Sequence, residues 1–218
     1  MSAPNGDVRK QVAENDGNEE FVSFPEVIDG KIATEEFLAA AQGIVRMVDK
    51  FGKLFAPVKY DMQGNIDKIN TKYNSNRQQH LTLQDLILLE KAGGRDLIAT
   101  DALLWLRRGL YMIQLFFEEI IEDHKAGRRT EDLGAFLKKA YKEALEPFHG
   151  WMAQQLFNLI ARMVPTKTAL LQAMANGKPG QEDITLKDLE VVLIGMKTNV
   201  INLCSFYEQY NLNNNARV

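Results

Sequence analysis

The feature that most constrains this sequence is a helical stretch, from about Arg95 to His124, that is apolar on nearly every side. A helix of this kind is stable in water only when other helices cover it. We therefore predict that this stretch is the central helix of an all-α fold. Its large apolar residues are Leu103, Leu104, Leu106, Leu110, Met112, Ile113, Leu115, Phe116, Phe117, Ile120 and Ile121.

The rest of the chain shows further helical periodicity, with no convincing strand pattern and no internal repeat. We expect about eight helices in a single domain, residues 21–218, and a polar, disordered tail over residues 1–20. Helices are predicted over about 34–48, 61–74, 82–93, 95–124, 130–146, 147–164, 166–177 and 185–210, with a connector from Gly52 to Lys59. Threonine suits a helix N-cap, so caps are predicted at Thr34, Thr82, Thr130, Thr166 and Thr185.

Composition and charge argue against several classes of function. Hydrophobic residues make up 45% of the 218 residues, as in ordinary globular proteins. The net charge of −3 argues against nucleic acid as a partner, because phosphate neutralisation dominates that binding. We expect no membrane span, since the best apolar run, Gly109 to Phe117, is too short. We expect no secretory signal either, since the N-terminus has no apolar stretch. With one cysteine, Cys204, no internal disulfide can form, which is typical of a reducing compartment. We therefore expect a cytoplasmic protein, and we also expect a monomer.

Three polar residues share one face of the predicted helix 61–74. Asp61, Asn65 and Lys68 are spaced i, i+4 and i+7, which places them within roughly 60° of one another. An apolar stripe runs beside them through Met62, Ile66, Ile69 and Tyr73. The polar row therefore flanks the buried face. A carboxylate, an amide and a cation held in line there indicate a recognition surface for a polar group.

The polar row is the first of three motifs that together resemble the glycolipid transfer protein family. D-x-x-x-N-x-x-K lies at 61–68, W-L-R-R-G-L at 105–110 and H-G-W at 149–151. The resemblance extends from about Thr34 to the C-terminus and implies an all-α domain in two helix layers that enclose a hydrophobic lipid pocket. It also implies a non-enzymatic intracellular carrier, which binds glycosphingolipids and transfers them between membranes with no metal or other cofactor.

Five residues match those that hold the sugar headgroup and the ceramide amide of the lipid in the family. The resemblance implies that the first sugar stacks on the indole of Trp105, whose negative face meets the C–H groups of the sugar ring. Asn65 and Lys68 would pair with sugar hydroxyls. Asp61 and His149 would clamp the two sides of the ceramide amide.

The predicted helix that Pro147 opens carries the residues expected near a membrane. Pro147 suits its first turn, which places His149 near a helix N-terminus, where a neutral imidazole is favoured. Trp151 lies about 200° further round that helix. It matches an aromatic residue that touches the bilayer in the family, and Phe148 is expected to assist it. Some members carry a tyrosine two residues before the C-terminus, where this chain has Ala216.

Catalytic interpretations stay open from the residues alone. Glu146 and His149 have the i, i+3 spacing of a di-metal carboxylate bundle, although only one such motif is present. Cys204 could be a nucleophile with His149 as its base, although a lone cysteine on a helix also suits core packing. A dyad of Asp61 and His149 would make the chain a small hydrolase.

The nature of the ligand is open in the same way. Trp105 and Trp151 are also consistent with ordinary core packing. Adjacent Arg107 and Arg108 could meet a phosphate, but most such pairs are solvated or bridged to acids. A related subfamily carries ceramide phosphate and has arginine in place of Trp105, so Trp105 and Asn65 favour a sugar. Transfer of ceramide phosphate or another sphingolipid is one alternative, and a glycolipid sensor that binds without net transport is another.

Overall fold

The structure is a computed structural model that describes residues 21–94 and 96–218, so the predicted tail over 1–20 lies outside the described residues. Apart from two isolated bridges, the described residues form no β-structure, and the all-α prediction is confirmed. The elements are α1 (Thr34–Asp49), the 3₁₀-helix η1 (Lys53–Phe55), α2 (Ala56–Ser75), α3 (Leu83–Ala92), α4 (Ile98–Lys125), α5 (Gly134–Ala144), the 3₁₀-helix η2 (Glu146–Phe148), α6 (Trp151–Ala161), α7 (Lys167–Met174) and α8 (Glu182–Gln209).

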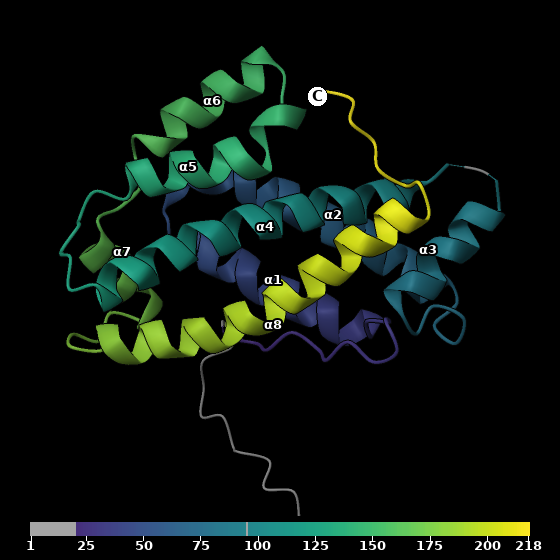
Figure 1. Cartoon of the computed structure of the whole chain (residues 1–218), viewed down its shortest axis with the longest axis horizontal. Helices are drawn as coiled ribbons and strands as arrows, with labels where there is room; N and C mark the ends of the chain where they lie inside the picture. The colour runs from purple at the N-terminus through teal and green to yellow at the C-terminus, as the bar shows by residue number, and fades with distance from the viewer. Residues whose placement is uncertain (1–20, 95) are drawn as a thin grey trace, which may run out of the picture.

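Helix α4 lies at the centre of two packed layers. It contacts α2, α5 and α8, while α1 packs on α2 and α6 packs on α5. Figure 1 shows α1 and α2 behind α4 and α8, with α5 and α6 above α4. The predicted two-layer arrangement around a central helix is therefore confirmed.

The central position of α4 follows from its sequence. Buried residues lie around most of its circumference, and they include Leu110, Ile113, Phe116 and Phe117. Phe51, which follows α1, packs against the rings of Phe116 and Phe117. Burying a side chain of this size contributes about 1.5–3 kcal/mol. The cover over the apolar sides of α4 thus supplies a large share of the hydrophobic stabilisation.

Helix α8 is the one described helix that is long and apolar enough to span a membrane by length and composition, a feature that the sequence analysis did not single out. In the structure α8 packs on α4 and α7. Phe24 lies against Gly195 on another part of its surface. The helix therefore behaves as a core helix of the domain. Its buried apolar residues include Leu186, Leu189, Val192, Leu193, Met196, Val200 and Leu203.

Helix boundaries were predicted less well than the helices themselves. The hydroxyls of Thr82 and Thr166 accept hydrogen bonds from backbone N–H groups in the first turns of α3 and α7, so these two caps are confirmed. Thr34 and Thr185 lie within α1 and α8, so their caps are wrong. The connector from Gly52 to Lys59 is also wrong, because η1 lies within it and α2 starts before its end. A proline is compatible with the first turn of a helix, and Pro57 lies in the first turn of α2.

Thr130 does not cap α5, because it belongs to a buried polar network around Asp123. The Asp123 side chain is 1% exposed and pairs with Arg128 Nε at 3.0 Å and Lys167 Nζ at 3.1 Å. The Thr130 hydroxyl donates to the same carboxylate at 2.8 Å. Burial alone would raise the pKa of Asp123, but these donors outweigh it and lower the pKa to about 2. The network ties the end of α4 to the start of α7.

We predict that Asp123→Ala lowers the free energy of unfolding by about 3 kcal/mol, because it leaves the buried ammonium of Lys167 unpaired. Urea denaturation at pH 7 measures the change. The matched control is Glu190→Ala, which removes a surface ion pair with Lys125 and should cost about 1 kcal/mol or less. Equal losses in the two variants contradict the assigned role of Asp123.

The same network sets a pH dependence. Because the folded-state pKa of Asp123 is depressed, its contribution to stability is complete above the ordinary value of 3.8 and is lost as the pH falls toward about 2. The difference in unfolding free energy between wild type and Asp123→Ala should therefore shrink over that range.

Candidate functional site

One cavity brings together all five residues that the sequence analysis assigned to ligand binding. It has a volume of about 450 Å³ and is lined by α2, α4 and α6. Asp61, Asn65 and Lys68 come from α2, Trp105 from α4, and His149 from the turn between η2 and α6. A polar cluster on an apolar wall is the usual composition of a small-molecule site. The rest of the lining is Pro57, Val58, Met62, Gly109, Met112, Leu145, Ala153, Leu156, Phe157, Ile160 and Val218.

The polar row of α2 lies at the edge of its buried face, where the helical spacing predicted it. Asn65 is 5% exposed, and its amide donates to the Asp61 carboxylate at 3.4 Å. Loss of surrounding water raises the pKa of Asp61 above its ordinary value, and the Lys68 ammonium partly offsets this rise. Asp61 and Lys68 keep contact with solvent. Both charged groups are therefore accessible to a polar group that enters the cavity.

One face of α4 forms the opposite wall. Trp105, Gly109 and Met112 line the cavity because their i, i+4 and i+7 spacing puts them on one side of the helix. A Cβ at Gly109 would lie 3.8 Å from Met62 Cγ, so the glycine leaves room between α4 and α2. Trp105 is half-buried, with part of its indole open to the cavity.

His149 is not in a helix, contrary to the prediction. Pro147 opens only the short η2, and His149 follows it with an extended backbone, at φ −97° and ψ 133°. The expected effect of a helix N-terminus on the imidazole is therefore absent. Its ring instead stacks on Trp105, with centroids 5.8 Å apart and 21° between planes, and its Nδ1 lies 3.0 Å from the Tyr141 hydroxyl.

The imidazole of His149 nevertheless favours its neutral form. Burial is the larger cause, and the positive charge of Arg108 adds to it, so the pKa of His149 falls below its ordinary value of 6.5. The neutral ring that the sequence analysis expected thus arises from desolvation and a neighbouring cation. A neutral ring has one N–H donor and one acceptor nitrogen.

Arg108 lies beside the site, whereas the sequence analysis considered it only as one of two arginines that could meet a phosphate. It is 5% exposed, and within residues 21–94 and 96–218 it pairs with no carboxylate. Its guanidinium carbon lies 4.9 Å from the centroid of Trp105 and 3.4 Å from that of Phe148, and Nη2 donates to the Asn214 carbonyl at 2.6 Å. Burial and the nearby Arg107 lower the pKa of Arg108 to about 10, so it stays charged at neutral pH. Its i+3 spacing from Trp105 is the signal that could have found it.

The segment before Val218 completes this side of the site. The Val218 N–H donates to the Phe148 carbonyl at 3.0 Å, and the Val218 carbonyl accepts from the Gly150 N–H at 2.6 Å. Arg217 Nε donates to the Pro147 carbonyl at 3.2 Å. A Cβ at Gly150 would lie 3.1 Å from the Val218 carbonyl oxygen, so glycine permits this close approach. The segment therefore holds the turn that carries His149.

An exposed apolar surface lies on α6, the helix that also lines the cavity. We call it the α6 surface; it consists of Trp151, Met152, Leu156 and Leu159 on α6 and Met163 in the turn that follows. Trp151 is 73% exposed, which excludes the alternative of core packing.

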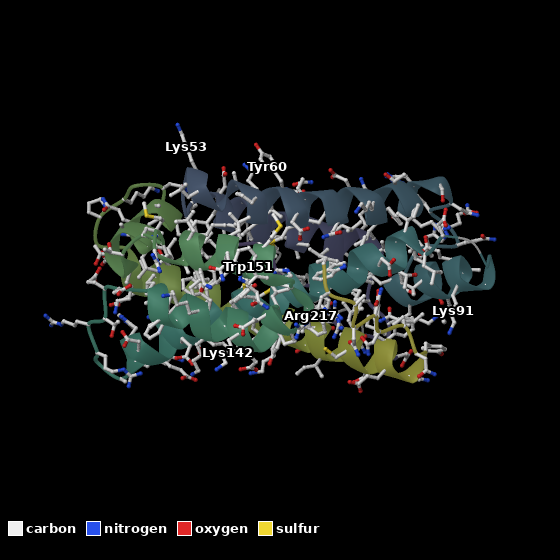
Figure 2. All side chains as sticks on the ribbon, turned by 90° about the horizontal axis from the view of Figure 1, so that it is seen from above. Lys53, Tyr60, Lys91, Lys142, Trp151 and Arg217 are labelled. Carbon is white, nitrogen blue, oxygen red and sulfur yellow. The ribbon has the colours of Figure 1, made fainter. Side chains whose placement is uncertain are left out.

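Basic and aromatic side chains accompany the α6 surface. In the view of Figure 2, Lys53 and Tyr60 lie on one side of Trp151, and Lys142 and Arg217 lie on the other. Tyr60 is 71% exposed. Phe148, in contrast, is half-buried under the Arg108 guanidinium, so its contact with a membrane stays a prediction.

The catalytic interpretations gain little from the contacts. The thiol of Cys204 accepts a hydrogen bond from Arg107, and His149 Nδ1 faces Tyr141 instead of Cys204. Within the part of the chain that the structure describes, no three His, Cys, Asp or Glu side chains form a group that could hold a metal ion. Asp61 and His149 do share the cavity, so the dyad is the catalytic alternative that an experiment has to test.

Comparisons of the sequence with known proteins point to one family. The family model described as Glycolipid transfer protein (GLTP) matches residues 32–176. The human pleckstrin homology domain-containing family A member 8 is 33% identical over 204 residues, which cover 89% of this chain and 38% of that protein. The chain thus spans less than half the length of the curated relatives that it matches.

Two solved structures share the fold. A structure of FAPP2, which concerns how that protein selects simple glycosphingolipids using the GLTP fold, matches with a TM-score of 0.78 and 31% identity, over 94% of this chain and 98% of that one. The structure of HET-C2, a fungal glycolipid transfer protein, matches with a TM-score of 0.74 and 28% identity, over 86% and 92% of the two chains.

We predict that Arg108→Gln raises the pKa of His149, because the substitution removes a positive charge that disfavours the imidazolium. NMR titration of the His149 ring protons measures the pKa. Arg107→Gln is the matched control, since Arg107 contacts Cys204 and the Tyr207 ring, and it should leave the pKa of His149 close to that of wild type. An equal rise in both variants, or none in either, contradicts the assigned cause.

Proposed function

The chain belongs to the glycolipid transfer protein family, and on that premise we propose that it is a non-enzymatic carrier of glycosphingolipids. The observation that carries the proposal is the single cavity in which Asp61, Asn65, Lys68, Trp105 and His149 meet an apolar wall. A glycosphingolipid has the same division, because its hydroxyl-rich head is joined by a glycosidic bond to a sphingoid chain, which carries the acyl chain on an amide. The carrier takes one lipid from a donor membrane, shields its chains and releases it at an acceptor membrane.

The headgroup end of the lipid meets the polar cluster. The first sugar stacks on the part of the Trp105 indole that is open to the cavity, because the C–H face of a sugar complements the negative face of an aromatic ring. Asn65 and Lys68 then pair with the hydroxyls at the ring edge. The amide of Asn65 is already oriented by its bond to Asp61, which reduces the ordering that binding requires.

Asp61 and His149 take the ceramide amide between them. The Asp61 carboxylate accepts from the amide N–H, and the neutral imidazole of His149 donates to the amide carbonyl. The depressed pKa of His149 keeps the ring neutral near pH 7, so it presents a single N–H donor. Asp61 accepts one hydrogen bond and His149 donates the other, so the two together fix the lipid at the junction of its head and chains.

The hydrocarbon chains occupy the apolar part of the cavity. Its volume of about 450 Å³ is near the lower end for ligand pockets, so two long chains require α2 and α6 to separate. Helix α6 packs chiefly on α5 and is the lining helix with least other support. Each buried CH₂ group contributes about 0.8 kcal/mol, which offsets what the chains lose on leaving a bilayer.

The α6 surface is the part of the molecule that touches the membrane. Trp151 prefers the bilayer interface, where its indole meets both headgroups and hydrocarbon. Contact by α6 also brings a membrane against a helix that lines the cavity, so docking and opening would occur at the same place. The net charge of −3 favours brief association without strong attraction to anionic lipids. We propose a monomeric, cytoplasmic protein that associates with membranes transiently.

One observation favours a second candidate, transfer of ceramide phosphate. Arg108 is a buried cation beside Trp105, although it does not line the cavity itself, and Lys68 is a second cation, which does. A phosphate would gain from both charges. Trp105 and Asn65 favour the sugar, because a flat indole and an amide add nothing specific to a phosphate. The sugar-bearing lipid is therefore the first choice.

We predict that Asp61→Val lowers the rate of glycosylceramide transfer between vesicles roughly tenfold or more, because a hydrogen bond to a charged group is worth about 1.5–3 kcal/mol. Asp67→Val is the matched control. Asp67 lies on the same helix, is exposed and accepts from Gln63, but does not line the cavity. Normal transfer by a folded Asp61→Val variant, or an equal loss in both variants, contradicts the assigned role.

We predict that Trp151→Ala weakens binding to phosphatidylcholine vesicles and slows transfer, yet leaves the affinity for a dispersed short-chain glycosylceramide nearly unchanged. Trp151 is 73% exposed and does not line the cavity, so its removal takes apolar area from the α6 surface alone. Ile201→Ala removes an apolar side chain of 57% exposure on α8 and should change neither property. Vesicle sedimentation and a binding titration separate the two effects. A matched loss with Ile201→Ala means that the membrane contacts another surface.

A further inference from the structure

Tyr141 contacts the functional site without lining the cavity. It lies on α5 and is 3% exposed. Its ring stacks on Phe157, with centroids 3.7 Å apart and 7° between planes, and its hydroxyl lies 3.0 Å from His149 Nδ1. Among the described residues His149 is the one hydrogen-bond partner of this hydroxyl. This buried hydroxyl makes none of the ligand contacts proposed above.

Two arrangements of protons are compatible with the distance between Tyr141 and His149. In the first, the tyrosine hydroxyl donates to Nδ1, and the imidazole proton is on Nε2. In the second, Nδ1 carries the proton and donates to the tyrosine oxygen, which leaves the hydroxyl proton of Tyr141 without an acceptor in the described structure. An unmade hydrogen bond by a buried donor costs about 1–3 kcal/mol. The first arrangement is therefore favoured.

Protonation states agree with the first arrangement. Burial, with a smaller effect of Glu146, raises the pKa of Tyr141 to about 12, so its hydroxyl keeps its proton near pH 7. Burial and Arg108 lower the pKa of His149, so its ring offers an acceptor nitrogen. A hydroxyl that keeps its proton thus faces a ring that has one unprotonated nitrogen to accept it.

We infer that Tyr141 is a positioning residue that holds His149 in the tautomer with the proton on Nε2, so that the ring always presents an N–H donor to a carbonyl oxygen of the bound lipid. This inference rests on the proposed function, because it assumes a carbonyl-bearing ligand such as a ceramide amide. It also gives α5 a part in recognition, although α5 does not line the cavity itself.

The aromatic rings around Tyr141 and His149 also restrict the orientation of the imidazole. The imidazole stacks on Trp105 with 21° between planes, and this contact limits rotation of the ring about the Cβ–Cγ bond of His149. Phe157 stacks on Tyr141 and lines the cavity, so the tyrosine is clamped between α6 and the imidazole. Without the hydroxyl, the stacking contacts would stay, but nothing on the described chain would distinguish Nδ1 from Nε2.

The first test is NMR spectroscopy of the ligand-free protein. The ¹⁵N chemical shifts of the His149 ring report which nitrogen carries the proton. We expect the Nε2–H tautomer in wild type and a mixture of tautomers in Tyr141→Phe, a variant that keeps the stacked ring. A wild-type protein with the proton on Nδ1 overturns the inference, and so does a Tyr141→Phe protein with an unchanged tautomer. The wild-type measurement decides even if the variant does not fold.

The second test asks whether Tyr141 acts through His149. Binding of a glucosylceramide with an eight-carbon acyl chain is measured for wild type, Tyr141→Phe, His149→Gln and the double variant. A glutamine amide donates an N–H with no tautomer to select, so Tyr141→Phe should weaken binding roughly 2–10-fold in wild type and not at all in the His149→Gln background. An equal loss in both backgrounds would show that Tyr141 acts by packing, which overturns the inference.

The two tests also separate this inference from the proposed function. If wild type does not bind the glucosylceramide, the proposed function fails, while the tautomer measured in the ligand-free protein still stands or falls by itself. If wild type binds the lipid but the tautomer is unchanged in Tyr141→Phe, the carrier function stands and the positioning role fails.

Discussion

The structure depends on one constraint, which is that α4 is apolar around most of its circumference and has to be covered there by other helices. Helices α2, α5 and α8 supply most of that cover. Over the stripe of Trp105, Gly109 and Met112, α2 and α6 cover α4 without filling the space between them. The cavity is thus a consequence of the way the core is closed. The polar row of α2 reaches it because that row flanks the face that α2 buries.

The polar side of the site is held by a cation in an unusual setting. A buried guanidinium without a carboxylate is costly, and Nε and Nη1 of Arg108 have no hydrogen-bond partner among the described residues. Two aromatic rings and the Asn214 carbonyl compensate part of that cost. The Arg108 side chain thereby contacts Trp105, the turn that holds Phe148 and the segment before Val218. We interpret Arg108 as the residue that holds the Trp105 indole and the turn of His149 in their relative positions.

The sequence was sufficient for the fold class and for the residues of α2 and α4 that meet in the cavity, because helical periodicity reports which side chains share a face. It was insufficient for the η2 turn, where Pro147 indicated a full helix and His149 proved to be extended. Tyr141 was missed because its partner His149 lies on another element. Arg108 was considered only for a phosphate, because its contacts with Phe148 and Asn214 come from other segments. Contacts that depend on how helices pack, such as the bond from Tyr141 to His149, leave no periodic trace in one sequence.

The central claim is that this cavity carries a sugar-bearing sphingolipid and does no chemistry on it. A transfer assay with glucosylceramide and ceramide phosphate in the same donor vesicles, followed by mass spectrometry of both membranes, tests that claim most directly. The account predicts that wild-type protein moves glucosylceramide faster than ceramide phosphate and that the lipid arrives intact. Faster movement of the phosphate, no net movement of either lipid, or release of free ceramide that depends on His149 would contradict it.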